Sequence, residues 1–201
     1  MPWVTLTIIG ACLMAFVLTA IAQSGEERVS FSEQVVVEYF LDHPYLQLGE
    51  RFKGYTYYSL KQQRDRQTIS PPDDLEQLQL EQFELDALVE AFYEVRGETP
   101  YFRWGLVPTQ QKPIAWFTHM LMHVGLLHLF GNLFILYLAG PPLEDAWGHL
   151  GFAIFNVVAG LVAAFFFIAG IPNIDEPLIG ASGALAGVMG GFAVRFWNSR
   201  M

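Results

Sequence analysis

The sequence predicts an all-α protein, a multi-pass membrane helical bundle with a large soluble loop after its first helix. Two observations lead to this fold class. Of the 201 residues, 53% are hydrophobic and only 15% are charged, and the mean hydropathy is +0.32. The charges are also segregated, since nine of the eleven basic and sixteen of the twenty acidic residues lie between positions 23 and 113. Long uncharged stretches beside one polar block are typical of a membrane protein.

The overall charge argues against a nucleic-acid partner. Eleven Lys and Arg against twenty Asp and Glu give a net charge of −9, whereas phosphate backbones require a basic surface. The lipid bilayer is the expected surrounding instead. Because Cys12 is the single cysteine, it cannot form an intrachain disulfide, and we interpret it as a small packing residue.

Residues 2–22 are predicted to form the first spanning helix. They carry no charge, and their number matches the roughly 20 residues that cross a bilayer. A cleaved signal peptide is the alternative, because Ala20-Ile21-Ala22 has the form of a cleavage site. No basic residue precedes the stretch, and it is longer than the usual apolar core of a signal peptide, so we favour the spanning helix.

The block 23–113 holds nine basic against sixteen acidic residues and is predicted to lie in water. Capping and first-turn signals at 70–74, followed by apolar residues at helical spacing, predict an amphipathic helix at about 74–96. Its apolar stripe is expected to pack on the rest of this loop or on the membrane surface, with a specific partner site as the weaker alternative. A shorter helix is predicted at about 31–41.

Residues 114–201 are predicted to form the core of the bundle, with spans at about 114–138, 150–170 and 179–196. Turns at Gly140-Pro141-Pro142 and within 171–178 separate them. Four spans put Arg195 and Arg200 on the side of the membrane opposite the 23–113 block. The positive-inside tendency would make that side cytoplasmic, so the block is expected outside the cytoplasm.

Three histidines in the second predicted span need an explanation, because polar groups at membrane depth are costly unless they face partners or a cavity. At 100° per residue, His128 and Asn132 share one helix face, whereas His123 lies about 140° round the helix. We expect His128 and Asn132 to serve one site and His123 another, with a purely structural role as the alternative for each. His119 and His123 have the spacing of helical zinc ligands, but the glutamate of HExxH is missing, so a metal site is only a rival hypothesis.

A second signal opens the fourth predicted span. Gly180 and Gly183 flank Ala181-Ser182 and allow close backbone approach. A serine at a helix start lies among free backbone N–H groups that can stabilise an oxyanion, which makes Ser182 a candidate nucleophile. An N-cap serine is the alternative. Beyond it, a glycine every fourth residue predicts a face for close helix packing, formed by Gly183, Gly187 and Gly191.

Together these residues resemble the rhomboid family of intramembrane serine proteases. The resemblance rests on three groups of residues: His123, His128 and Asn132; Glu144 and Gly148; and Gly180-Ala181-Ser182-Gly183. Residues 2–5 at the start of the first span and residues 101–108 before the second also look like parts of the family pattern. The loop at 23–99 is not covered by the resemblance and looks like an expansion of the family's first loop.

The resemblance implies part of a six-helix fold and a Ser-His dyad that cleaves transmembrane segments of other proteins without metal or cofactor. It makes Ser182 the nucleophile, with His128 and Asn132 as oxyanion donors. It makes four residues structural neighbours of the site: His123, Gly180, Gly183 and Glu144. Such a protein would lie in a membrane, and we expect a bacterial inner membrane.

The family's general base is a histidine on the sixth span, and only 19 residues follow Ser182 in this sequence. We therefore expect a fragment without the base, inactive as it stands, whose glycine stripe is partly uncovered. The alternative function is that of a non-catalytic rhomboid-like protein that binds transmembrane clients.

Overall fold

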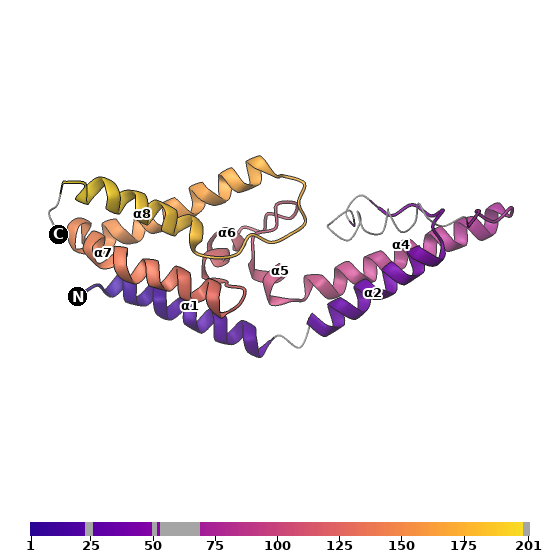
Figure 1. Cartoon of the computed structure of the whole chain (residues 1–201), viewed down its shortest axis with the longest axis horizontal. Helices are drawn as coiled ribbons and strands as arrows, with labels where there is room; N and C mark the ends of the chain where they lie inside the picture. The colour runs from indigo at the N-terminus through magenta and orange to yellow at the C-terminus, as the bar shows by residue number, and fades with distance from the viewer. Residues whose placement is uncertain (23–25, 50–51, 53–68, 199–201) are drawn as a thin grey trace. The chain divides into compact units, whose positions relative to one another are not determined.

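The computed structural model describes residues 1–22, 26–49, 52 and 69–198. Figure 1 shows their helices, which fall into two compact units, Met1–Gln23 with Pro100–Met201 and Ser24–Thr99. Apart from one isolated bridge, the described residues contain no strand, so the predicted all-α class is confirmed for them. The polar unit ends at residue 99 rather than at 113, because Leu106 pairs with Leu178 and so joins the residues after 99 to the other unit.

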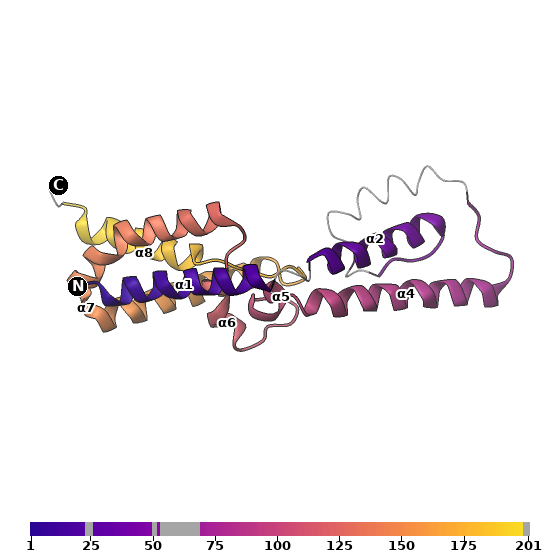
Figure 2. The same cartoon turned by 90° about the horizontal axis from the view of Figure 1, so that it is seen from below.

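The unit Ser24–Thr99 is a helix pair. Helix α2 spans Glu26–Asp42 and α4 spans Leu75–Gly97, and the two run antiparallel, as Figure 2 shows. The N-terminus of α4 is capped by Asp74, whose side chain accepts a 3.0 Å hydrogen bond from the Glu76 N–H. The buried core of the unit lies between the helices and consists of Val36, Phe40, Leu46, Leu48, Phe52, Leu85 and Phe92. The apolar stripe expected at 74–96 therefore packs on the rest of its own loop.

The other unit contains α1 (Trp3–Ile21), α5 (Pro100–Trp104), α6 (Ala115–Thr118), the 3₁₀ turn η3 (His119–Leu121), α7 (Leu126–Gly170) and α8 (Ser182–Phe196). Within α7, Gly148 has φ 73° and ψ 164°, values that no helical residue adopts. Gly148 thus divides α7 into two helical parts, 126–147 and 149–170.

The prediction of one helix over 114–138 is wrong in its first half. Helix α6 and η3 are short, Met122 is extended at φ −83° and ψ 143°, and Gly125 has φ 78° just before α7 begins. A left-handed glycine cannot continue an α-helix, so the apolar pattern was not a sufficient signal there.

The predicted turn at Gly140-Pro141-Pro142 is also wrong, since both prolines lie inside α7 and the chain turns at Gly148 instead. Gly140 serves packing, because a Cβ on it would lie 2.9 Å from Thr5 Oγ1 on α1. The glycine that suggested a turn therefore allows α1 and α7 to pack closely.

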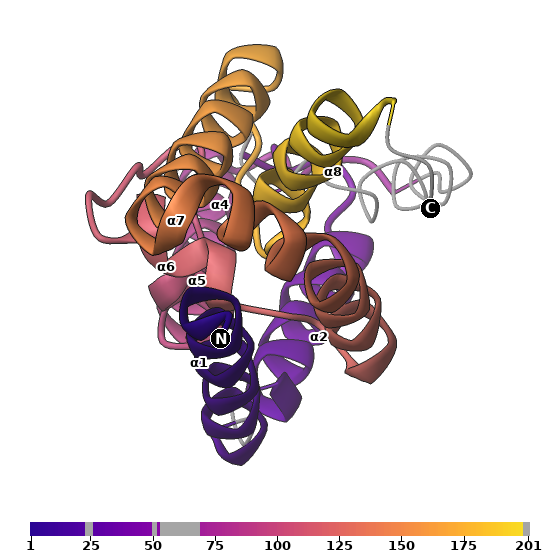
Figure 3. The same cartoon turned by 90° about the vertical axis from the view of Figure 1, so that its left-hand side faces the viewer.

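The glycine stripe of α8 faces the second part of α7. A Cβ on Gly183 would lie 2.6 Å from the Cβ of Ala163, and one on Gly187 would lie 2.5 Å from the Cβ of Ala159. Gly191 continues the row against the rings of Trp147 and Phe155. Figure 3, seen nearly along the helices, shows α8 beside α7. The expected packing face is confirmed, because small residues four apart on α7 match it. Gly183, Gly187 and Gly191 are each half-buried, so the face is also partly uncovered, as expected.

Among the described residues, two helices are long and apolar enough to cross a bilayer, α1 and α7. Helix α8 is apolar but shorter, at 15 residues. Length and composition of these helices therefore agree with a membrane protein.

Candidate functional site

The ring of His128, in the first turn of α7, packs on the backbone of Gly180, two residues before Ser182. A Cβ on Gly180 would lie 2.9 Å from both Cε1 and Nε2 of His128, and 3.7 Å from Asn132 Nδ2. Gly180 also has φ +116°, which side chains rarely adopt. The structure thus brings together His128, Asn132 and the segment that carries Ser182, and only a glycine fits between them.

The backbone of Gly180 is held from two sides. Its N–H donates to the carbonyl of His119 over 2.8 Å, and the preceding Leu178 exchanges two backbone hydrogen bonds of 3.0 and 2.9 Å with Leu106. A Cβ on Gly105 would lie 2.8 Å from Ile179 Cγ2, so the two segments are in close contact. The sequence pointed to the family pattern at 101–108 but not to this pairing or to the His119 carbonyl, because backbone acceptors carry no residue signature.

Ser182 is the first residue of α8, and Ala181 occupies the N-cap position without a side-chain capping bond. The N-cap alternative for Ser182 is therefore wrong. The first bond of the helix runs from the Leu185 N–H to the Ala181 carbonyl over 2.9 Å. The N–H groups of Ser182, Gly183 and Ala184 thus point out of the helix end, where they concentrate partial positive charge. Ser182 is exposed.

The helical spacing suggested that His123 serves a separate site, but its side chain lies beside that of His128. Its ring centroid is 5.2 Å from that of His128, with the planes at 65°. Because His123 precedes the helix in an extended segment, the 100° rule does not apply to it. Its Nδ1 donates to the Leu121 carbonyl over 3.1 Å, and the side chain is fully buried. His119 Nδ1 likewise donates to the Ala115 carbonyl over 2.9 Å. Because Met122 is extended, His119 and His123 do not lie on one helix, and the helical spacing of zinc ligands is not realised.

Two buried polar atoms at this place lack a partner. Among the described residues, Asn132 Nδ2 and His123 Nε2 are the buried side-chain nitrogen or oxygen atoms without a hydrogen bond. An unsatisfied buried polar group costs about 1–3 kcal/mol, so its presence in a folded protein calls for an explanation. Asn132 Nδ2 is a donor, whereas His123 Nε2 is an acceptor when Nδ1 carries the proton. The arrangement can bind a polar group that enters beside Gly180.

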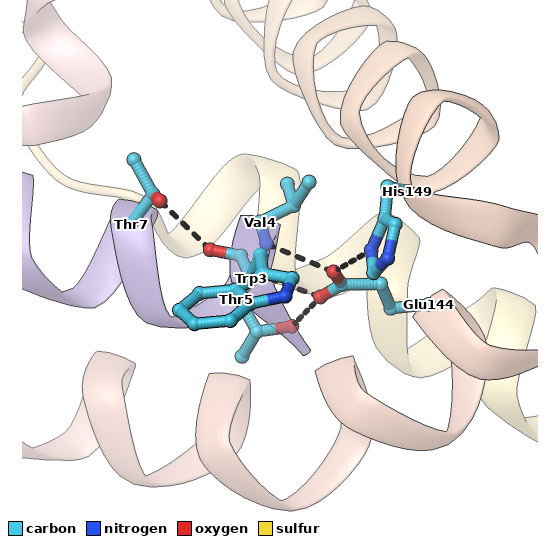
Figure 4. A network of polar contacts seen from close by, with 6 residues as sticks. All are labelled: Trp3, Val4, Thr5, Thr7, Glu144 and His149. Carbon is cyan, nitrogen blue, oxygen red and sulfur yellow. Dashed lines mark hydrogen bonds and ion pairs between the residues drawn. The ribbon is translucent and has the colours of Figure 1, made fainter. Parts of the chain in front are cut away.

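The resemblance makes Glu144 a structural residue near the site, and the structure places it toward the end of the first part of α7. It lies twelve residues beyond Asn132, about 18 Å along a helix. Figure 4 shows its carboxylate at the N-terminus of α1, where it accepts bonds from the N–H groups of Val4 and Thr5, each of 2.8 Å, and from Thr5 Oγ1 over 2.7 Å. His149 Nδ1 donates to the same carboxylate. Glu144 therefore ties α1 to α7, and the sequence did not indicate its partner His149.

The comparison with protein families agrees with this geometry. Residues 110–201 match the family model of the rhomboid domain. The resemblance predicted from the motifs is therefore confirmed for this part of the chain, and the rhomboid domain contains His128, Asn132, Gly180 and Ser182.

The chain also has a relative among the curated proteins. Rhomboid-related protein 2 of the mouse, Mus musculus, is 33% identical over 85 residues, which are 41% of this chain and 28% of that protein. The chain thus spans less than a third of the length of this relative. No solved structure matches the chain. The rhomboid domain and the apolar helices indicate an integral membrane protein, but a mouse relative lends no support to the expected bacterial inner membrane.

Proposed function

We propose that the rhomboid domain is part of an intramembrane serine endopeptidase that cleaves transmembrane segments of other proteins. Ser182 is the nucleophile, and the oxyanion of the tetrahedral intermediate is stabilised by His128, Asn132 and the Ser182 N–H. The observation that carries this proposal is the unpaired, buried Asn132 Nδ2, 3.7 Å from the position of a Cβ on Gly180.

The chemistry requires donors that are in place before the charge forms. An oxyanion develops only when the hydroxyl attacks the peptide carbonyl, and donors that need no reorganisation then stabilise it most. An amide donor left without a partner in the resting protein fulfils that condition. The N-terminus of α8 adds the partial positive charge of its free N–H groups.

None of the five histidines of the sequence is proposed as the general base. His43 belongs to the other unit, and His149 is bound to Glu144. His119 and His123 each have Nδ1 bonded to a backbone carbonyl, and His128 is assigned to the oxyanion. Since a serine hydroxyl without a base is a weak nucleophile at neutral pH, we expect cleavage to need a further histidine.

The membrane arrangement that fits this function has four crossings. Gly148 divides α7 into two parts of 22 residues each, about 33 Å long, and each alone is sufficient to cross a hydrocarbon core of about 30 Å. Helix α1 and the shorter α8, which is about 22 Å long and needs its flanking residues to reach across, complete the four spans of the proposal.

The experiment compares residues 1–201 with a chimera in which the last two spans of a rhomboid relative follow residue 201. We expect the chimera to cleave a transmembrane substrate and to be labelled at Ser182 by a serine-directed phosphonate, while residues 1–201 do neither.

The Ser182→Ala variant of the chimera should lose both activities, and Ser199→Ala is the control that should keep them. If the chimera binds a transmembrane substrate but neither cleaves it nor reacts with the phosphonate, the rhomboid-like client-binding function replaces the protease proposal.

A further inference from the structure

Helix α4 has a second apolar face in addition to the one that packs on α2. We name the residues Leu80, Phe83, Ala87 and Ala91 the outer stripe. At 100° per residue they lie within an arc of about 80°, on the side opposite Leu85 and Phe92, which are buried against α2. A helix that packs on only one neighbour needs only one such face.

The outer stripe is exposed in the structure. Phe83 is 71% and Leu80 is 59% exposed, and Ala87 and Ala91 are also exposed. Single exposed apolar side chains are normal, but four on one helix face at steps of three and four residues form a continuous patch. The patch extends over about 16 Å, which is three helical turns.

Acidic residues surround the outer stripe. Glu76 and Glu94 lie on the same arc, and Glu90 lies at one edge. Glu84 lies at the other edge, where its carboxylate accepts a hydrogen bond of 2.7 Å from Tyr39 Oη on α2. Among the described residues, no basic side chain contacts Glu76, Glu90 or Glu94. The one basic residue of α4, Arg96, lies over the ring of Phe92 at 5.6 Å, on the face toward α2. The negative charge around the stripe is thus not neutralised by the helix itself.

We propose that the outer stripe binds a cationic amphipathic helix of another protein, whose apolar residues contact Leu80 and Phe83 and whose Lys and Arg residues face the surrounding glutamates. Charge complementarity selects this partner. A second copy of the chain would bring four glutamates against four others, and an anionic membrane surface would repel the same face. The proposal is independent of the protease function.

The test uses the full chain in nanodiscs of zwitterionic lipid, which do not attract cationic peptides by charge. The probe is a fluorescent 16-residue helical peptide with leucines at steps of three and four residues, flanked by Lys and Arg. We expect binding that weakens as salt is raised, because the charges are exposed. Phe83→Ala should weaken the affinity about tenfold, as loss of a central apolar contact does. Glu90→Gln with Glu94→Gln should weaken it and flatten the salt dependence.

Matched controls keep the test decisive. Leu75→Ala removes a side chain of the same helix that is 72% exposed but lies outside the outer stripe, and it should leave the affinity unchanged. Glu27→Gln on α2 is the control for charge. Equal losses in Phe83→Ala and Leu75→Ala, or equal binding of a peptide with Glu in place of Lys and Arg, would overturn the proposal. A chain dimer that Phe83→Ala dissociates would assign the stripe to a second copy instead.

Discussion

The imidazole of His128 and the backbone of Gly180 are in contact although 52 residues separate them in the sequence, with 2.9 Å between the ring and the position of a Cβ on Gly180. This contact joins the start of α7 to the start of α8. It sets where Ser182 lies relative to Asn132, so the site depends on the absence of one methyl group.

Gly180→Ala should destabilise the protein and disturb the site together. The substitution adds a methyl group against the His128 ring and places alanine at φ +116°, where backbone strain costs roughly 1–3 kcal/mol. The measurement is unfolding of the full chain in detergent and phosphonate labelling of Ser182 in the chimera. Gly125→Ala separates the two effects, because Gly125 has φ +78° but no neighbour within 4 Å. It should lose stability while labelling is retained.

Asn132→Leu should separate catalysis from stability. Because Asn132 Nδ2 has no partner in the structure, its removal should leave the stability unchanged or raise it. The labelling rate of Ser182 in the chimera should fall about 10²- to 10³-fold, as for the loss of one oxyanion donor. Asn156→Leu, on the second part of α7, is the control. A parallel fall of stability and labelling would instead indicate a structural role for Asn132.

Gly187→Ala should destabilise the contact between α7 and α8, because the new Cβ would lie 2.5 Å from that of Ala159. Overpacking of this kind costs typically about 1–3 kcal/mol. Gly190→Ala lies in the same helix with no neighbour within 4 Å and should be neutral or stabilising by up to about 1 kcal/mol. Unfolding in a denaturing detergent compares the two, and equal midpoints would contradict the packing described.

Glu144→Gln should loosen the N-terminus of α1. The carboxylate accepts bonds from Val4, Thr5 and His149, and an amide has one acceptor oxygen fewer, so a buried donor is left unpaired at about 1–3 kcal/mol. Hydrogen exchange at the Val4 and Thr5 amides should accelerate. Asp145→Asn, at the exposed neighbouring position, should leave the exchange unchanged.

The unit Ser24–Thr99 should lose stability at both ends of the pH scale through one hydrogen bond. Tyr45 Oη donates to Glu81 Oε2 over 2.6 Å, which raises the pKa of Tyr45 to about 12 and lowers the pKa of Glu81. The bond therefore contributes fully below the unfolded tyrosine pKa of about 10, and its contribution is lost as pH rises toward 12. The contribution of Glu81 is present above its unfolded pKa and is lost as pH falls below about 4.5.

Hydrogen exchange of the α4 amides as a function of pH measures this stability in the full chain. Tyr45→Phe should reduce the loss of stability at both low and high pH, because the hydrogen bond to Glu81 is then absent. An unchanged pH profile would show that the bond does not contribute to the stability.

The sequence alone determined what depends on composition and short-range spacing. Uncharged stretches predicted apolar helices, the Asp74 signal predicted the start of α4, and the glycines at every fourth position predicted a packing face. The motifs at His128, Asn132 and Ser182 predicted the family, because their residue types and order are specific even where the local structure is misjudged.

Only the tertiary structure decided where the helices end and which residues meet. Gly148 turns the chain although Pro141 and Pro142 carry the stronger local signal, and His123 lies against His128 because an extended segment precedes α7. The sequence does not distinguish a glycine at which the chain turns, such as Gly148, from one that allows close packing of another helix, such as Gly140. Which role it takes depends on packing energy between segments distant in sequence, and local spacing carries no information about that energy.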